Sequence, residues 1–211
     1  MTGPDSVNQK PINVVQGMTV KQVQQQGTKA QADAASLFDL DSDGVYSKDE
    51  AKAFNNFDIT KEDGGIFMKS KEGNHEIRLK YDNPEQLNGL TVTDYCRLEH
   101  KENGENNDYA KDTSVKVYDE KSMNVEYDLN NKTLKIANKT ENREGSIKAR
   151  NLNSVEIENS DVEDLDAIGT KNVKLTNVQD RGLWNSKSTV YVDGNANLDF
   201  DAETQAKVER E

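Results

Sequence analysis

Oxygen-bearing side chains alternate along a short stretch of the 211-residue sequence, LFDLDSDGVYSKDEAKAF, which runs from Leu37 to Phe54. Alternate residues of a tight loop point inward, and a cation of calcium's size takes roughly six to eight oxygen ligands. Gly44, the sixth residue of the loop, allows the positive φ at which the chain doubles back. The stretch therefore predicts a calcium site. Its expected ligands are Asp39, Asp41, Asp43, the backbone carbonyl of Val45, Ser47 and, through both carboxylate oxygens, Glu50.

The composition offers a simpler interpretation of this acidic run. The chain carries 39 Asp and Glu against 27 Lys and Arg, a net charge of −12. Acidic runs in such a chain are usually solvated surface. Solvated surface, however, does not require strict alternation, a glycine at position six and a glutamate at position twelve. We therefore favour the metal site.

The residues around the loop favour helices. KAQADAASLF, ahead of the loop, is rich in alanine, and Ala51, Phe54 and Phe57 recur behind it on one helix face. The segment SLFDLDSDGVYSKDE resembles the EF-hand family, and the resemblance covers about Thr28 to Phe57. It implies that calcium binds through the six residues just named.

Two features depart from the pattern of paired hands. Tyr46 stands at loop position eight, where a branched aliphatic residue normally pairs with a partner loop. The best candidate partner, DITKEDGGIFMK, has Lys69 where the bidentate carboxylate belongs. We expect this segment to be a turn leading into a strand, with GIFM pairing beside Val45 and Tyr46. We expect residues 12–27 to form a strand and a polar helix that pack on the loop.

Composition bounds the remaining possibilities. The hydrophobic fraction is 33 %, and the mean hydropathy is −0.96, low for an ordinary globular core but compatible with a thin-cored repeat protein. Cys96 is the sole cysteine, so no internal disulfide can form. No apolar run is long enough to span a membrane. The negative net charge argues against nucleic acid as a partner.

Five short runs of alternating apolar residues occupy the C-terminal two-thirds, and their starts lie 17 to 21 residues apart. They read VKVYD, LKIAN, VEIEN, VKLTN and VYVDG. A repeat near twenty residues predicts a solenoid. The side chains expected to point inward and stack are Val115, Val117, Leu134, Ile136, Val155, Ile157, Val173, Leu175, Val190 and Val192.

The same alternation predicts an outward column and a repeated corner residue. The outward column is Lys116, Lys135, Glu156, Lys174 and Tyr191, in which Glu156 lies between two lysines. Three consecutive runs end in asparagine: Asn138, Asn159 and Asn177. Asparagine tolerates the left-handed conformation, and stacked asparagines can hydrogen-bond along the axis.

This pattern resembles right-handed parallel β-helix proteins of the pectate-lyase-like class. The expected fold class is α+β, a small helical EF-hand followed by a mainly-β parallel solenoid. An antiparallel β-sandwich, which also has short alternating strands, is the alternative. We expect an N-terminal segment with the hand at residues 1–70, a solenoid domain at 71–200 and a C-terminal cap helix at 201–211.

A second run of oxygen-bearing residues lies near the C-terminus. Asp193, Asn195, Asn197 and Asp199 alternate and form a candidate weak second metal site. Leu198 stands where the loop glycine belongs, and Thr204 replaces the bidentate glutamate. The alternative is a polar cap over the open end of the coil.

No catalytic constellation stands out, and the sequence favours a protein that is not an enzyme. We expect a calcium-binding bacterial protein, secreted or on the cell surface, whose solenoid offers an interaction face to a glycan or a cell-surface protein. A glycan-binding or lyase-like glycan-active protein with structural calcium is the alternative. No leader peptide is visible, which leaves a cytoplasmic calcium sensor as a third possibility.

Overall fold

The structure is a computed structural model. It describes residues 10–72, 74–93, 96–101, 113–119, 121–139, 146–179 and 187–210. The helical elements are α1 (Val20–Gln26), α2 (Lys29–Ala34), η1 (Ala35–Phe38), α3 (Lys48–Asn55) and η2 (Pro84–Leu87). Among the described residues, none of these helices has the length and apolar character needed to cross a bilayer.

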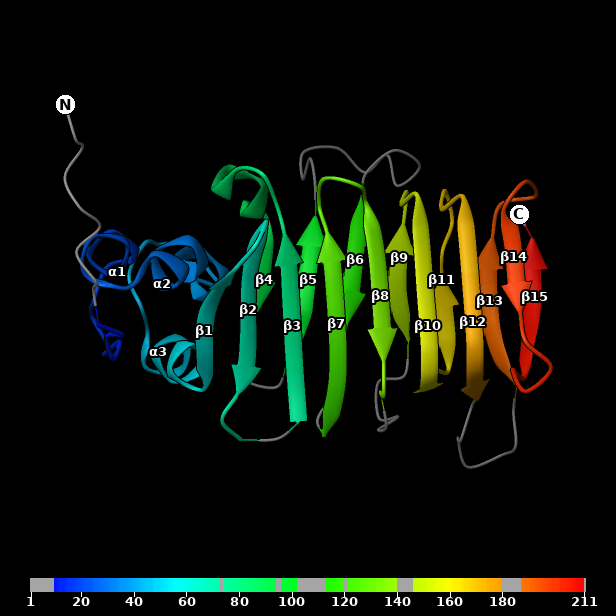
Figure 1. Cartoon of the computed structure of the whole chain (residues 1–211), viewed down its shortest axis with the longest axis horizontal. Helices are drawn as coiled ribbons and strands as arrows, with labels where there is room; N and C mark the ends of the chain where they lie inside the picture. The colour runs from blue at the N-terminus through cyan, green and yellow to red at the C-terminus, as the bar shows by residue number, and fades with distance from the viewer. Residues whose placement is uncertain are drawn as a thin grey trace.

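The rest of the described chain is mostly β and forms two facing sheets (Figure 1). The eight-stranded sheet has the order β1 (Phe57–Glu62), β2 (Gly65–Ser70), β3 (Asn74–Lys80), β7 (Ser122–Asp128), β8 (Thr133–Ala137), β10 (Ser154–Asp161), β12 (Asn172–Gln179) and β14 (Asn197–Phe200). The seven-stranded sheet has the order β15 (Ala206–Arg210), β13 (Ser188–Val192), β11 (Asp164–Asp166), β9 (Ile147–Arg150), β6 (Ser114–Val117), β5 (Leu98–Lys101) and β4 (Leu90–Val92).

From β8 onward the chain forms the predicted parallel solenoid, of about three turns. Successive strands alternate between the two sheets, and each pairs in parallel with the strand one turn later in the same sheet. The N-terminal half is different. There β1, β2 and β3 form an antiparallel meander, β3 pairs in parallel with β7, and β7 pairs antiparallel with β8. In the opposite sheet, β4, β5, β6 and β9 pair antiparallel. The solenoid is therefore confirmed for the C-terminal part, whereas the N-terminal half, called the sandwich half below, is mostly antiparallel with one parallel pair, β3 with β7.

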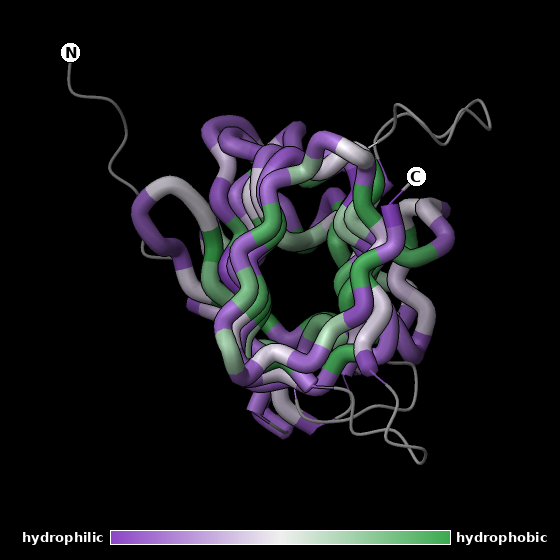
Figure 2. The backbone as a smooth tube through the Cα atoms, turned by 90° about the vertical axis from the view of Figure 1, so that its right-hand side faces the viewer, coloured by the Kyte–Doolittle hydropathy of each residue, from purple (hydrophilic) through white to green (hydrophobic). Residues whose placement is uncertain are grey.

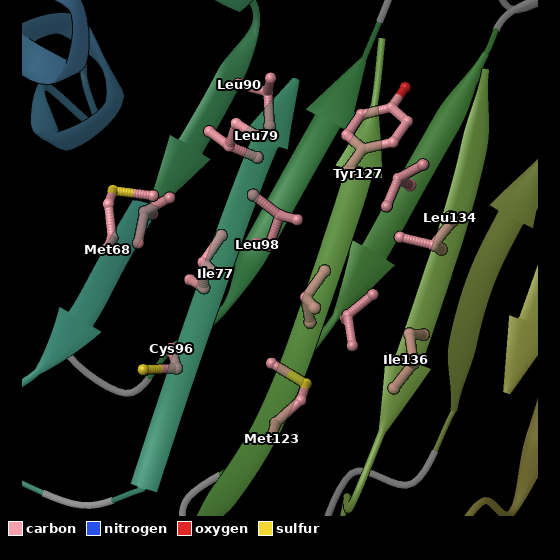
Figure 3. Packing of buried hydrophobic residues seen from close by; sticks show 14 of the residues in the cluster. Met68, Ile77, Leu79, Leu90, Cys96, Leu98, Met123, Tyr127, Leu134 and Ile136 are labelled. Carbon is pink, nitrogen blue, oxygen red and sulfur yellow. The ribbon is translucent and has the colours of Figure 1, made fainter. Parts of the chain in front are cut away.

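The interior consists of apolar side chains enclosed between the two sheets. All ten residues predicted to point inward have an exposed fraction of 1 % or less. Figure 2, which looks along the long axis, shows hydrophobic residues on the inner side of both walls. Figure 3 shows such side chains, among them Ile77 of β3 and Leu98 of β5, directed into the space between the sheets. The structure therefore confirms the buried face of each strand that the alternation predicted.

The expectation of a single column of five runs was wrong. The runs that begin at Val115 and Val190 form β6 and β13, which belong to the seven-stranded sheet, whereas the other three lie in the eight-stranded sheet. Period-two alternation identifies the buried face of a strand but not the sheet that contains it. Within the three runs that share a sheet, Glu156 does lie between two lysines, with Lys174 Nζ at 2.5 Å and Lys135 Nζ at 3.7 Å.

Asparagines occupy the predicted left-handed positions. Asn138, Asn159 and Asn177 have φ of 59°, 48° and 50°, and the Asn177 amide donates to Asn159 Oδ1 over 3.0 Å. A second asparagine ladder, which the sequence reasoning missed, runs near the starts of the strands of the same sheet. Asn172 Nδ2 donates to the carbonyl of Asn153 over 2.8 Å, and Asn197 Nδ2 donates to Asn172 Oδ1 over 3.1 Å.

The C-terminus differs from the expected cap helix at 201–211. Residues Ala206–Arg210 form β15, which pairs in parallel with β13 and extends the seven-stranded sheet. Asp201 accepts hydrogen bonds from the backbone N–H and the hydroxyl of Thr204, which makes a local turn rather than a helix start. At the other expected boundary, Ser70 is the last residue of β2, which pairs with β3 in the same sheet.

The helices α1, α2 and α3 lie at one end of the two-sheet stack (Figure 1). The buried apolar residues form one continuous cluster from Val14 in the helical part to Ala196 in the last turn. A polar bridge also joins the parts: Tyr81 Oη and Lys61 Nζ donate to Asp33 Oδ2 of α2 over 2.7 and 3.0 Å. The helical part therefore shares its core with the sheets.

Substitution at adjacent positions of β10 tests the assignment of faces. Ile157→Asp places an unpaired charge in the core and should lower the free energy of unfolding by about 3 kcal/mol or more. The control, Glu156→Gln, removes ion pairs to exposed lysines and should cost under about 1 kcal/mol. Urea unfolding at pH 7 measures both. Equal losses would contradict the assignment.

Candidate metal centre

The acidic loop joins η1 to α3, and both neighbours are fixed by aromatic packing. Phe38 of η1 and Phe54 of α3 make an edge-to-face contact with ring centroids 5.2 Å apart. Tyr46, in the loop itself, is fully buried against Phe54, and its hydroxyl donates to the carbonyl of Ala35 over 2.6 Å. The unusual residue at loop position eight thus anchors the loop to the core.

The loop pairs with the N-terminal segment. Thr19 and Val45 form an antiparallel bridge, in which Tyr46 N donates to the carbonyl of Met18 over 2.8 Å. The expected pairing of GIFM beside Val45 and Tyr46 was wrong, because β2 pairs with β1 and β3. The chain immediately N-terminal to α1 therefore takes the position beside Val45 and Tyr46 that was expected for GIFM.

Two side-chain amides hold this N-terminal segment against the helices. Gln31 of α2 accepts from Ile12 N over 3.0 Å and donates to the Ile12 carbonyl over 2.9 Å. Asn55 of α3 does the same with Val14, over 2.9 and 2.6 Å. Each side-chain amide makes the two backbone hydrogen bonds that a neighbouring β-strand would make, so the segment is held through its backbone. Sequence reasoning missed both residues, because no spacing pattern distinguishes them from solvated polar residues.

Three of the predicted ligands come together in the loop. Carboxylate oxygens of Asp39, Asp41 and Asp43 lie within 4.8 Å of one another. The backbone reverses at Ser42 and Gly44, whose φ values are 60° and 80°. Short hydrogen bonds set the fold of the loop: Gly44 N donates to Asp39 Oδ2 over 3.1 Å, and Val45 N donates to Asp43 Oδ1 over 2.7 Å.

Asp39 is the buried member of this cluster. Its exposed fraction is 8 %, and its Oδ1 is buried without a hydrogen-bond partner in the described structure. Burial, together with the nearby carboxylates of Glu50, Asp43 and Asp41, raises the pKa of Asp39 despite the hydrogen bond from Gly44. A buried carboxylate oxygen without a donor is costly, so the position is poorly suited to a purely structural aspartate.

Glu50 lies beside the cluster, and its oxygens have other partners. Its exposed fraction is 4 %; Oε1 accepts from Leu40 N over 2.6 Å, and Oε2 accepts from Ser47 N over 2.8 Å. Burial would raise the pKa of Glu50, but the hydrogen bonds from Ser47 and Leu40 outweigh it and hold the pKa below its usual value. Ser47 caps α3, and its hydroxyl accepts from Glu50 N over 3.3 Å. Glu50 is not part of the mutually close set formed by the described aspartates.

The donor set fits a hard divalent cation. Its three aspartates offer only oxygen, Asp39 has one oxygen without a partner, and Glu50 and Ser47 border the same loop. Calcium accepts such mixed, irregular oxygen shells, whereas softer metals prefer nitrogen or sulfur. Bound calcium would supply positive charge to the buried oxygen of Asp39.

The C-terminal candidate residues lie along the last turn of the solenoid. Asp193 accepts from Gly169 N over 2.9 Å, and Asn197 belongs to the second asparagine ladder. Asn195 is exposed in a turn, and Asp199 is the cross-strand neighbour of Lys174. These contacts stabilise the coil, and a metal role for the four residues stays a prediction.

Comparison with known proteins gives no independent assignment. No protein-family model, curated protein or solved structure matches the chain. The interpretation of the loop therefore depends on its own geometry and chemistry.

Asp39→Asn separates stability from metal binding. Because the pKa of Asp39 is raised in the folded chain, its contribution to stability is present at low pH and is lost as the pH rises through the folded pKa. In EDTA at pH 7 the free energy of unfolding of the variant should therefore be about 1 kcal/mol higher than that of the natural sequence. Added calcium should no longer stabilise the variant. Thermal unfolding with EDTA or calcium measures both. The control, Asp49→Asn, should respond to calcium as the natural sequence does; a less stable Asp39→Asn in EDTA would contradict the prediction.

Proposed function

We propose that this chain is a non-enzymatic calcium-binding protein and that the loop from Asp39 to Glu50 holds one calcium ion. The observation that carries the proposal is the partnerless, buried Oδ1 of Asp39. A carboxylate oxygen of the same residue lies within 4.8 Å of carboxylate oxygens of Asp41 and Asp43. Natural structures rarely leave such an oxygen unsatisfied, and a bound cation would satisfy it.

The chemistry of the loop favours calcium over other common metals. Histidine and cysteine, the ligands that zinc and copper prefer, lie elsewhere: His75, His100 and Cys96 are buried in the sheet region. Magnesium demands a near-ideal octahedron and keeps several waters. A loop that mixes carboxylates, a hydroxyl and a backbone carbonyl suits the looser geometry of calcium.

Calcium would act on the helical cap, the unit formed by residues 10–56. Without a cation, Asp39, Asp41 and Asp43 repel one another at short range. A bound ion would reverse this repulsion and tighten the loop, to which the N-terminal segment is paired through Thr19. The helical cap shares its apolar core with the sheets, so calcium would secure one end of the two-sheet stack.

A binding role is also favoured by the positions of the residues most suited to catalysis. His75 and His100 are buried, and His100 Nδ1 is engaged by the hydroxyl of Tyr127 at 2.8 Å. Within the described residues the three aspartates form the one such cluster, and a single loop suits the millimolar calcium found outside cells. We therefore propose that the protein is secreted or on the cell surface, with a cytoplasmic sensor as the alternative.

Calorimetric titration with calcium and magnesium tests the site. We expect one calcium per chain, with magnesium weaker. Glu50→Gln removes a charge and one of two ligand oxygens, so the calcium affinity should fall about a hundredfold or more. Asp49→Asn, a neighbouring exposed carboxylate, is the matched control and should change little. Titration of Glu50→Gln like the natural sequence would refute the assignment.

Amide hydrogen exchange, measured in calcium and in EDTA, tests which parts of the chain the bound ion stabilises. Binding at a hundredfold excess over Kd stabilises the bound state by about 2.7 kcal/mol. Stability in stacked arrays is mostly a nearest-neighbour property. Chelation should therefore weaken protection in residues 10–56 and leave β10, β12 and β13 unchanged. Loss of protection in all three strands would show that cap and coil unfold together.

A further inference from the structure

The two-sheet stack ends in strands β14 and β15, at the end opposite the helices α1, α2 and α3 (Figure 1). The inner side chains of these two strands are only partly buried: Leu198, Phe200, Ala206 and Val208. Their neighbours one turn earlier, among them Val173 and Val190, are 1 % exposed. The apolar interior therefore stays partly open to solvent at this end. The acidic loop lies at the other end and takes no part in this surface.

At the opposite end of the stack, helices border the outermost strands. There β1 contacts α2 and α3, and β4 contacts η1. Among the described residues, by contrast, β15 pairs with β13 alone. The side of β15 away from β13, called the free edge below, thus has no described strand beside it. An unpaired edge presents a row of backbone donors and acceptors that a further strand can bind.

The strand register shows which residues of β15 turn their backbone groups toward the free edge. Ser188 is paired with Ala206 and donates its N–H to the carbonyl of Gln205 over 3.2 Å. Backbone groups alternate sides along a strand, so Lys207 and Glu209 direct theirs to β13. The residues that direct theirs to the free edge are Ala206, Val208 and Arg210. A strand bound at this edge would exchange hydrogen bonds with the middle one of these three.

The outward side chains of β15 are self-complementary in charge. Lys207 and Glu209 flank Val208 on the outer face, where they are 65 % and 43 % exposed and form an ion pair of 2.6 Å within the chain. If a second copy of β15 lies antiparallel with Val208 opposite Val208, each Lys207 faces Glu209 of the other copy. Opposed residues of an antiparallel pair have Cβ atoms about 4.5–5.5 Å apart, and opposite charges there stabilise the pairing.

The same two charges disfavour other registers. A shift by two residues, the smallest that keeps each side chain on its face, places Lys207 opposite Lys207 or Glu209 opposite Glu209. Like charges directly opposite destabilise a pair. A lysine on an edge strand often serves to keep other strands away. On β15 the glutamate two residues later makes one partner an exception, and that partner is the same strand of a second chain.

The other charged groups of this end do not oppose the register. Arg210, which would face Ala206 of the second copy, already donates to three carbonyls of its own chain. The nearest acidic residues that precede β15 are Asp199 on β14 and Asp201 and Glu203 in the segment between the two strands. They repel a second chain at a distance, but at physiological ionic strength charges more than about 8 Å apart are largely screened.

We propose that the free edge of β15 binds β15 of a second copy of this chain, in antiparallel register about Val208, and that the two chains form a two-fold symmetric dimer. The 5 residues of β15, at about 3.3 Å each, make an edge of about 17 Å, and stacked sheets lie about 10 Å apart. Contact over so small an end face is typical of weak, transient interfaces. Because helices border the other end of the stack, the association stops at two chains.

Sedimentation velocity on the full chain, over a concentration series up to about 1 mM, tests the dimer. We expect the natural sequence to dimerise reversibly. Lys207→Glu and Glu209→Lys each place like charges opposite one another across the two-fold axis, and each should weaken the dimer about tenfold or more. An equimolar mixture of the two variants restores both ion pairs between chains and should dimerise again, although each variant has lost its own internal pair. Lys21→Glu, which makes the same change of net charge as Lys207→Glu but lies in α1, is the control and should leave association unchanged.

Amide hydrogen exchange at a low and a high protein concentration locates the contact. Exchange at Val208, whose N–H faces the free edge, should slow at the higher concentration, whereas exchange at Glu209, whose N–H faces β13, should not change. A natural sequence that stays monomeric throughout the series, or single variants that dimerise as it does, would overturn the inference. A mixture that associates no better than its components would overturn it as well, and oligomers of more than two chains would exclude the closed two-fold arrangement.

Discussion

The structure depends on the burial of alternate apolar side chains between two sheets. Every turn of the solenoid contributes a few such residues, and the residue between each apolar pair of β8, β10, β12 and β13 is lysine, glutamate or tyrosine. This narrow interior explains how a chain with 33 % hydrophobic residues can enclose a continuous core. It also leaves the outward positions free to vary. On the eight-stranded sheet these positions form ion pairs, and on the seven-stranded sheet they line a hollow over β6, β9, β11 and β13.

The sequence could predict the buried face of each strand but not the path of the chain. All ten residues assigned to the interior are buried, because alternation directly reports which side of a strand meets the core. Membership of a sheet depends on the turns between runs, and only the three runs that end in asparagine share the eight-stranded sheet; Val115 and Val190, whose runs end differently, were placed in the wrong column. The last strand was missed for a similar reason. AKVER has too few apolar residues to distinguish a strand at the edge of a sheet from a short helix.

In the acidic loop, too, the sequence predicted the local arrangement of residues but not their tertiary contacts. Spacing alone identified Asp39, Asp41 and Asp43, because a tight turn brings alternate residues together whatever surrounds it. The neighbours of the loop could not be predicted. The pairing of Thr19 with Val45, and the clamps formed by Gln31 and Asn55, join residues that are far apart in sequence. The burial that makes Asp39 unusual follows from these tertiary contacts.

The two asparagine ladders have a consequence for the order in which the chain folds. Their hydrogen bonds join residues 18, 19 and 25 positions apart, so each new turn requires the closure of only a short loop onto the turn before it. By contrast, β3 must find β7 across a separation of 48 residues, as the pairing of Asn74 with Ser122 shows. We therefore expect the slow step of folding to lie in the sandwich half, where long closures are needed. Once an edge exists there, the coil can grow from it one turn at a time, with each finished turn acting as the template for the next.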